Sequence, residues 1–135
     1  MMLDLTSLKK AVASLERLSS KVTDRALMED LDPDLQEGLR AGLIQNFEFT
    51  YELCWKFIRR WLRENLGASY VDGLSRKDLF RMAAENRLVD DVKAWWGFHK
   101  ARNLTSHVYD EKTAEEVYQA ALAFLGPAKA LLETL

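Results

Sequence analysis

The sequence predicts an all-α protein that folds as an antiparallel up-and-down four-helix bundle with one additional short helix. Apolar residues recur at spacings of three and four over long stretches, and no segment shows the alternation of apolar and polar residues typical of a strand. Only 6 Gly and 2 Pro interrupt the 135 residues. This length is the usual size of one domain, so we expect residues 1–135 to form a single helical domain around one core.

The composition excludes several classes of protein. The first residues show no basic region followed by an apolar core, and no apolar run approaches the ~18 residues of a membrane span, so we expect a cytoplasmic protein without membrane contact. Cys54 has no cysteine partner and two histidines cannot form a zinc site, so we expect no disulfide, no metal and no other cofactor. The net charge of −2 argues against a protein coated in positive charge for duplex DNA but permits a local basic face.

A first amphipathic helix is expected over about residues 5–28. Asp4 or Thr6 can cap its start, and the pattern fades before Pro33, a residue that suits the first turn of the next helix. The apolar positions that define this helix are Leu5, Leu8, Val12, Leu15, Leu18 and Val22.

The longest helix is expected over residues 34–65, and Gly67 ends it because glycine accepts the left-handed geometry that follows a C-cap. Residues 68–74 are expected to form a loop. Phe49, Leu53 and Phe57 give this helix a second apolar face, so we expect it to contact both the core and a further helix or chain. Its main apolar face consists of Leu39, Leu43, Phe47, Tyr51, Cys54, Ile58, Trp61 and Leu62.

A basic stripe runs along the second half of this long helix. It can be a solvated face with a Glu52 to Lys56 ion pair worth about a few tenths of a kcal/mol. It can also be a surface that binds RNA or nucleotide phosphate. The residues of the stripe are Lys56, Arg59, Arg60 and Arg63.

The remaining helices are expected from their capping signals. Residues 75–78 resemble a capping box that opens a short helix ending near Asn86. Asp90 or Asp91 can start the next helix, and residues 113–116 can cap the last one. The pair of residues 126–127, Gly-Pro, should bend or break that last helix.

Titratable and hydrogen-bonding groups crowd together in the segment Arg102-Asn103-Leu104-Thr105-Ser106-His107-Val108-Tyr109 without serving an apolar stripe. If a helix runs through this segment, Asn103 and His107 share one face at i, i+4, and Arg102 lies beside them, nearer to Ser106. The helix end and the following carboxylates would then favour a charged imidazole, poised for proton transfer near neutral pH.

The same segment matches the Arg-x-x-x-x-His-x-Tyr signature of HEPN-domain proteins of the HepT toxin type. Residues 45–56, Gln-Asn-Phe-Glu-Phe-Thr-Tyr-Glu-Leu-Cys-Trp-Lys, also resemble the second-helix signature of the nucleotidyltransferase substrate-binding proteins, a sister group. The resemblance covers nearly the whole chain, since both segments lie in the right order. It implies a four-helix bundle with an extra short helix, a symmetric homodimer, and a companion minimal nucleotidyltransferase encoded nearby.

The resemblance also implies metal-independent cleavage of RNA in a cleft lined by two protomers, with catalytic roles for Arg102, Asn103 and His107. An imidazole can take the proton of a ribose 2′-hydroxyl or give one to the leaving 5′-oxygen, and a guanidinium can brace the phosphorane. The amide of Asn103 can fix the orientation of the histidine. Tyr109 matches the tyrosine that the partner nucleotidyltransferase modifies with AMP.

Simpler interpretations exist for these residues. A histidine near a helix end is commonly a cap or surface group, and Tyr109 can be a packed ring with a wet hydroxyl. His99 could join the site, but its aromatic neighbours in the sequence favour a structural role. The four tryptophans could stack on bases, but aromatic residues at helical spacing usually belong to a core or an interface.

Three classes of function therefore remain open at the level of the sequence. The first is an endoribonuclease toxin that its nucleotidyltransferase partner holds in check. The second is a non-catalytic subunit that presents a substrate to that partner. The third is a helical dimerisation module with no ligand.

Overall fold

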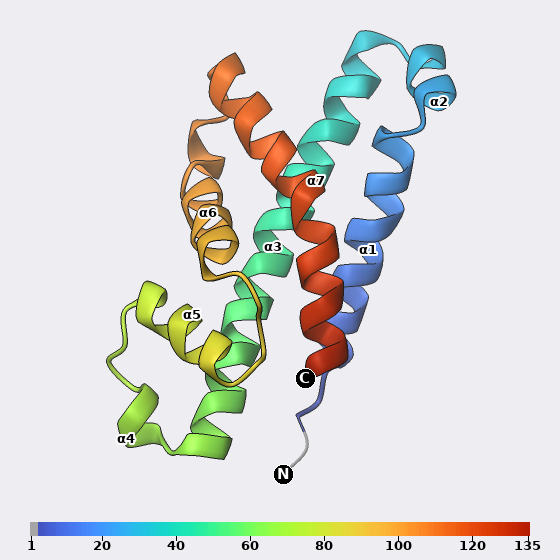
Figure 1. Cartoon of the computed structure of the whole chain (residues 1–135). Helices are drawn as coiled ribbons and strands as arrows, with labels where there is room; N and C mark the ends of the chain where they lie inside the picture. The colour runs from blue at the N-terminus through green and yellow to red at the C-terminus, as the bar shows by residue number, and fades with distance from the viewer. Residues whose placement is uncertain (1–2) are drawn as a thin grey trace.

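The computed structural model describes residues 3–135, and this part of the chain is helical with no strand. Helices α1, α3, α6 and α7 run up, down, up and down along the bundle (Figure 1), which confirms the predicted fold class. The elements are α1 (Thr6–Val22), α2 (Arg25–Asp30), α3 (Pro33–Leu66), α4 (Ala68–Val71), α5 (Arg76–Glu85), α6 (Val92–Asn103), the 3₁₀ helix η1 (Thr105–His107) and α7 (Glu111–Thr134).

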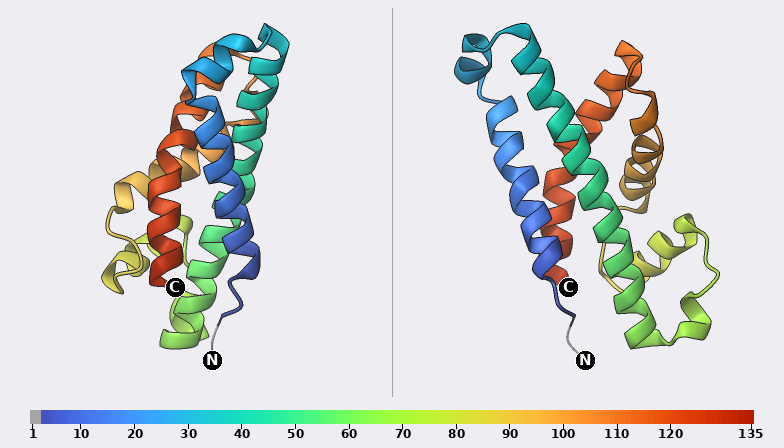
Figure 2. Two further views of the ribbon diagram at one scale, coloured as in Figure 1. Left: turned by 90° about the vertical axis from the view of Figure 1, so that its right-hand side faces the viewer. Right: turned by 180° about the vertical axis from the view of Figure 1, so that it is seen from behind.

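Helix α3 is the central element of the bundle. Helices α1 and α7 pack along it and against each other, and α6 packs against both α3 and α7. The short helices α4 and α5 lie beside the second half of α3, as the two views in Figure 2 also show. The start of α1 and the end of α7 lie at one end of the bundle, and the connection from α6 to α7 lies at the other (Figure 1).

The prediction of one helix over residues 5–28 is wrong, because a turn separates α1 from α2. The Thr23 hydroxyl donates to the carbonyl of Ser19, and the Asp24 carboxylate accepts from the backbone N–H of Leu27. Asp24 is therefore the N-cap of a new helix inside the predicted one. Asp32 caps α3 in the same way, directly before Pro33.

Helix α3 confirms the predicted long helix to within a residue at each end. Gly67 follows it with φ +101°, the left-handed region in which glycine is unstrained. The predicted loop over residues 68–74 is only partly correct, because its first residues form the single turn α4. Val71 is the buried residue of this turn, and its packing into the core holds the turn in place.

Of the caps predicted for α5, α6 and α7, two hold and one fails. The Ser75 hydroxyl caps α5 and the Asp91 carboxylate caps α6. Helix α7 begins earlier than expected, because Asp110 accepts hydrogen bonds from both the backbone N–H and the hydroxyl of Thr113. Pro127 does not break α7, which continues to Thr134. The preceding Gly126 has no Cβ to clash with the proline ring.

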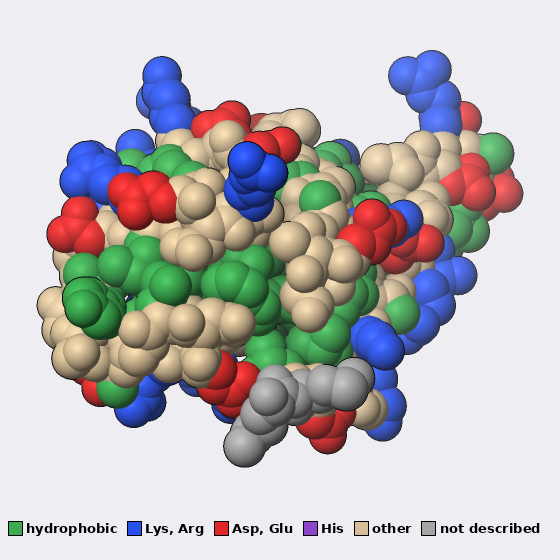
Figure 3. Space-filling view, turned by 60° about the horizontal axis from the view of Figure 1, so that its bottom comes forward, with side chains coloured by type: hydrophobic (Ala, Val, Ile, Leu, Met, Phe, Trp, Pro, Cys, Tyr) green, Lys and Arg blue, Asp and Glu red, His purple; other side chains and the backbone are tan. Residues whose placement is uncertain are grey.

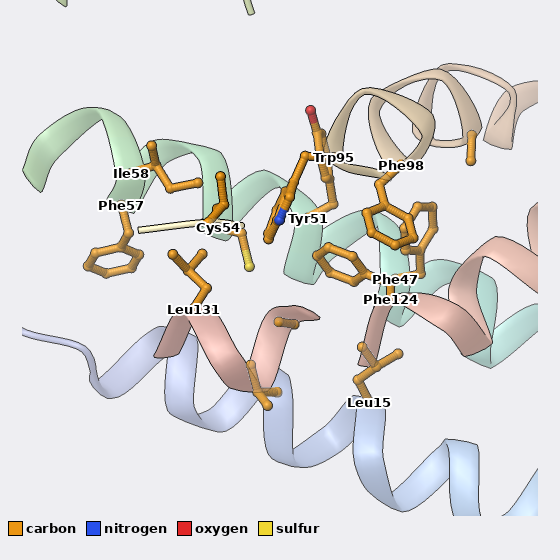
Figure 4. Packing of buried hydrophobic residues seen from close by; sticks show 14 of the residues in the cluster. Leu15, Phe47, Tyr51, Cys54, Phe57, Ile58, Trp95, Phe98, Phe124 and Leu131 are labelled. Atoms are coloured by element: carbon orange, nitrogen blue, oxygen red, sulfur yellow. The ribbon is translucent and has the colours of Figure 1, made fainter. Parts of the chain in front are cut away.

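The core is rich in aromatic side chains that α3, α5, α6 and α7 contribute. Figure 4 shows those of α3, α6 and α7, with Leu15 of α1 beneath them. Phe124 lies at its centre, 5.3 Å from Phe47, 5.4 Å from Trp95 and 4.9 Å from Phe98 between ring centroids. Cys54 is completely buried and fills core space as predicted, and burial raises the pKa of its thiol.

The predicted second apolar face of α3 is divided between the core and the surface. Phe57 is buried, whereas Phe49 is 63% exposed. Figure 3 views the end of the molecule where α7 stops, and hydrophobic side chains form a band across this face with most Lys and Arg side chains around its edge. Within residues 3–135, no helix combines the length and the apolar character that crossing a membrane would require.

Candidate functional site

The segment 102–109 lies at the connection from α6 to α7 and is not one continuous helix. Helix α6 ends at Asn103, and the 3₁₀ turn η1 follows. The Thr105 hydroxyl donates a 2.8 Å hydrogen bond to the carbonyl of Arg102, which competes with the next α-helical bond. The prediction that Asn103 and His107 share one helical face is therefore wrong.

His107 and Tyr109 form an exposed pair after this turn. The Nδ1 atom of His107 lies 3.5 Å from the Tyr109 hydroxyl oxygen, and the two rings meet edge to face. Tyr109 is 84% exposed, so the interpretation of a packed ring is wrong. Both the imidazole and the phenol are accessible to a large ligand or to a modifying enzyme.

Arg102 turns away from this pair and binds two carboxylates of α3. Its Nε donates a 2.7 Å hydrogen bond to Oε1 of Glu52, and its Nη2 lies 3.4 Å from Oε1 of Glu48. The other oxygen of Glu52 accepts from the indole N–H of Trp55 at 3.1 Å. The predicted position of Arg102 near Ser106 is therefore wrong, because these acids hold the guanidinium on α3.

Asn103 contacts His99 instead of His107. The amide nitrogen of Asn103 as placed lies 3.3 Å from Nε2 of His99, one helical turn earlier on α6. The His99 ring stacks on Trp96 with centroids 5.0 Å apart. In this geometry, Asn103 can orient His99 and cannot fix the orientation of His107.

His99 belongs to a polar network that joins three helices. Its Nδ1 atom lies 2.9 Å from the hydroxyl of Tyr51 on α3. Arg76 of α5 donates to the same hydroxyl at 3.2 Å and lies 3.5 Å from Nδ1 of His99. The Arg76 guanidinium also covers the ring of Trp55, 3.5 Å from its centroid.

The tautomer of His99 sets the direction of both of its hydrogen bonds. With the ring proton on Nε2, the Tyr51 hydroxyl donates to Nδ1 and the amide oxygen of Asn103 accepts from Nε2. With the ring proton on Nδ1, the ring donates to the Tyr51 hydroxyl and the amide nitrogen of Asn103 donates to Nε2. Burial, then Arg76 and Arg102, lower the pKa of His99, while Glu52 opposes them. Burial raises the pKa of Tyr51 to about 12 despite Arg76.

The sequence interpretation missed this network. The sequence places Tyr51 on the main apolar face of the long helix and within the second-helix signature, and it leaves His99 open between a site residue and a structural one. Neither interpretation predicts that the two side chains meet. Arg76 gave no signal, because it follows a helix cap and its pattern is that of an ordinary surface residue. The three residues come from separate helices, so no regular interval in the sequence relates them.

The basic stripe on α3 is exposed and partly neutralised by the chain itself. Arg59 and Arg63 both bind Oδ1 of Asp72, each at 3.2 Å. Arg60 packs over Phe57, with 5.0 Å between guanidinium and ring centroid. The expected pair of Glu52 with Lys56 does not form, since Arg102 and Trp55 hold Glu52 and the Lys56 ammonium lies 5.9 Å from the Trp55 ring centroid. Across residues 3–135, no group of three His, Cys, Asp or Glu side chains is placed to hold a metal ion.

Comparison with known proteins agrees with this fold and segment. Residues 3–135 match the family described as nucleotidyltransferase substrate binding protein like. The chain is 36% identical to a Haemophilus influenzae protein named "Probable ribonuclease HepT", over 98% of this chain and 92% of that protein. Solved structures match as well, two of them over nearly the whole chain. One of them comes from Haemophilus influenzae and is described as the fold of a substrate binding domain of a nucleotidyltransferase. It matches with a TM-score of 0.91 and 34% sequence identity, over 97% of this chain and 98% of its own. The other, from Thermus thermophilus, has a TM-score of 0.73 and 28% identity over 94% of this chain and 97% of its own.

The bundle and its exposed Arg-x-x-x-x-His-x-Tyr segment thus define a helical protein of the class that accompanies nucleotidyltransferases. The chain belongs to the nucleotidyltransferase substrate-binding protein family of the HepT type. The resemblance stated from residues 45–56 and 102–109 is confirmed.

Proposed function

We propose that this chain is an endoribonuclease toxin that cleaves RNA without a metal ion, as a homodimer, and that a minimal nucleotidyltransferase encoded nearby acts as its antitoxin. The observation that carries the proposal is the exposed pair of His107 and Tyr109. With Arg102, this pair has the Arg-x-x-x-x-His-x-Tyr spacing of the HepT type. The Haemophilus influenzae relative named for ribonuclease activity supports it over nearly the full chain.

The proposed chemistry assigns separate tasks to the imidazole and the guanidinium. His107 accepts the proton of a ribose 2′-hydroxyl as that oxygen attacks the adjacent phosphorus, or protonates the 5′-oxygen as it leaves. Arg102 stabilises the extra negative charge of the phosphorane. RNA is the substrate because DNA lacks the 2′-hydroxyl that acts as the nucleophile.

A second copy of the chain is needed in this proposal, because Arg102 and His107 do not converge within one chain. Glu48 and Glu52 occupy the Nη2 and Nε sides of Arg102, which leaves its Nη1 group to face a partner or a phosphate. Two copies that bring their 102–109 segments together would place four catalytic side chains along one cleft. The exposed Phe49 on α3 offers apolar area for such an interface.

Two further parts of the proposal concern phosphate. The basic stripe of Lys56, Arg59, Arg60 and Arg63 contacts the RNA backbone. The partner nucleotidyltransferase transfers AMP from ATP to the Tyr109 hydroxyl. The phenolic oxygen bonds to the α phosphorus and loses its proton, and the bond between the α and β phosphates breaks to release pyrophosphate. The exposure of Tyr109 supports this modification, and the product would place an anion beside His107.

The direct test is an RNA cleavage assay on purified wild-type chain with EDTA present. The proposal predicts cleavage products that end in a 2′,3′-cyclic phosphate, which mass spectrometry identifies. Cleavage that requires added metal, or products without the cyclic phosphate, would contradict the mechanism.

A second candidate function is a non-catalytic subunit that presents a substrate to the nucleotidyltransferase. The ion pairs of Arg102 with Glu48 and Glu52 favour this second function, since a guanidinium bound to two carboxylates is already neutralised. The solved structure described as a substrate binding domain of a nucleotidyltransferase supports it as well. Its signature would be no RNA cleavage by the pure chain, together with faster nucleotide transfer by the partner enzyme when the chain is added.

A further inference from the structure

A polar pocket lies between α3, α4 and the start of α5, away from the 102–109 segment. Its volume is about 260 Å³. Two of its lining residues are the arginines Arg59 and Arg76, and none is a carboxylate. The residues that line it are Trp55, Arg59, Val71, Gly73, Leu74, Arg76 and Leu79.

The charges around this pocket do not balance. One carboxylate, Asp72, is shared by the two arginines Arg59 and Arg63. Arg76 is half-buried, and within the part of the chain that the structure describes it forms no ion pair with an acid. A partly desolvated guanidinium without a counter-ion is a strong site for an anion.

The geometry of Arg76 prepares it to receive such an anion. The ring of Trp55 holds one face of its guanidinium, and the hydroxyl of Tyr51 takes one of its Nη1 protons. The Nε and Nη2 donors make no hydrogen bond within the described chain, so a planar fork remains for two acceptor oxygens. The first turn of α5 begins at Arg76 and adds the positive end of a helix dipole.

We propose that this pocket binds a phosphate group of a nucleotide or of an RNA backbone, with Arg76 and Arg59 as its ligands. The proposal rests on the proposed function for the class of ligand and adds to it a specific site and a residue, Arg76, outside the basic stripe. Pockets that enclose a whole small-molecule ligand usually measure ~300–1,000 Å³, so this volume suits the phosphate and not the complete nucleotide. Arg76 covers one face of the Trp55 ring, so that face is closed to a stacked base.

The pocket is connected to the candidate site through Arg76. The same guanidinium touches Tyr51 and lies 3.5 Å from His99, whose other ring nitrogen faces Asn103. The charged groups that act on His99 are Arg76, Arg102 and Glu52. A phosphate bound to Arg76 would offset its positive charge, so the pKa of His99 should rise when the pocket is filled.

The experiment is an NMR titration of the full chain with inorganic pyrophosphate, AMP and a short single-stranded RNA. The indole N–H resonance of Trp55, assigned with Trp55→Phe, reports on the pocket, and the His99 ring protons report on the coupling. We expect saturable shifts of both, and Arg76→Gln should weaken binding by about tenfold or more, since it removes charge-assisted hydrogen bonds. Arg59→Gln should weaken it as well.

A matched variant separates this site from a diffuse basic surface. Arg81→Gln changes an exposed arginine on α5 that pairs with Asp78 and lies outside the basic stripe. It should not change the affinity for pyrophosphate. If Arg76→Gln does not fold, the comparison of Arg59→Gln with Arg81→Gln decides the matter.

The outcomes of the titration show whether the phosphate comes from a free nucleotide or from RNA, and whether the proposed site exists. Binding of AMP and pyrophosphate without RNA assigns the pocket to free nucleotides, and binding of RNA assigns it to the backbone. Equal losses of pyrophosphate affinity in Arg81→Gln and Arg76→Gln, or no shift of the Trp55 resonance with any ligand, would overturn the site. The pyrophosphate titration is repeated in His107→Ala, where binding to the pocket must persist, so that loss of cleavage and loss of the pocket are measured separately.

Discussion

Arg102 and Glu52 form the shortest ion pair between α6 and α3, 2.7 Å from Nε to Oε1. This contact places the arginine of the signature segment on the central helix, beside Trp55 and away from His107. A carboxylate thus holds the arginine in position, and in the proposed mechanism this carboxylate competes with the RNA phosphate for it. The same side chain can therefore serve a structural role, bound to Glu52, or a catalytic role, bound to phosphate.

Removing the charge of Glu52 tests this competition. Glu52→Gln should tighten RNA binding at low salt, because Arg102 loses its closest counter-ion. It should lower the free energy of unfolding by about 0–1 kcal/mol, the range of a half-exposed ion pair. Fluorescence anisotropy and urea unfolding measure the two effects. Glu64→Gln, which changes an exposed residue of the same helix, is the control. An equal gain in RNA affinity from both variants would show that Glu52 does not compete specifically for Arg102.

Assembly is the second prediction. The wild-type chain should be a dimer at micromolar concentration, because Phe49 is 63% exposed and Leu104 is 37% exposed near the segment that the proposal brings together. Phe49→Glu or Leu104→Glu should give a monomer by light scattering. Tyr70→Glu, on α4 and also highly exposed, should leave the dimer intact. A monomeric wild-type chain would defeat the composite cleft.

The basic stripe gives a prediction with opposite signs in two variants. Arg59 and Arg63 share Asp72, so Asp72→Asn should free both and tighten RNA binding. The double change Arg59→Glu and Arg63→Glu should weaken it. Both effects should shrink as salt rises, since the contact is mostly counterion release. Asp78→Asn, which frees Arg81 on α5, is the matched control, and an affinity that is flat across the salt series would leave the stripe as solvated surface.

The sequence predicts the elements of this fold better than the contacts among its polar side chains. The spacing of apolar residues predicts each end of α3 to within one residue, because a long buried helix face produces a regular pattern in the sequence. The same reasoning missed the break at Asp24, where helical periodicity continues across a local cap. Arg76, Tyr51 and His99 meet from three helices, and no interval in the chain encodes that meeting.

His99 provides a prediction about pH. Its pKa in the folded protein lies below the ordinary value of 6.5, so the unfolded chain binds the proton more readily than the folded one. The contribution of His99 to stability is therefore complete above pH 6.5 and is lost as the pH falls from there toward the folded pKa. His99→Gln should reduce this part of the pH dependence, measured by urea unfolding between about pH 5 and about pH 8. NMR titration should also show that Arg76→Gln raises the pKa of His99, and an unchanged value would contradict the assigned network.

The catalytic prediction rests on the division of labour between His107 and Arg102. His107→Ala and Arg102→Ala should each reduce RNA cleavage in EDTA by about a hundred- to ten-thousand-fold, because one removes the proton-transfer group and the other the phosphorane-stabilising charge. Both variants should remain folded and dimeric by circular dichroism and light scattering. Ser106→Ala and Lys100→Ala are neighbouring exposed changes that should keep full activity.

Modification of Tyr109 should reproduce the loss of His107 without altering the histidine. AMP on the Tyr109 hydroxyl places a phosphate beside Nδ1 of His107, which lies 3.5 Å from that oxygen, and so fills the space that the scissile phosphate needs. Tyr109→Phe should keep cleavage and become insensitive to the nucleotidyltransferase, as a gel assay with and without the partner would show. Full ribonuclease activity in His107→Ala would defeat the mechanism, whereas inactivity of pure wild-type chain would favour the substrate-presenting subunit, in which Arg102 stays bound to Glu52.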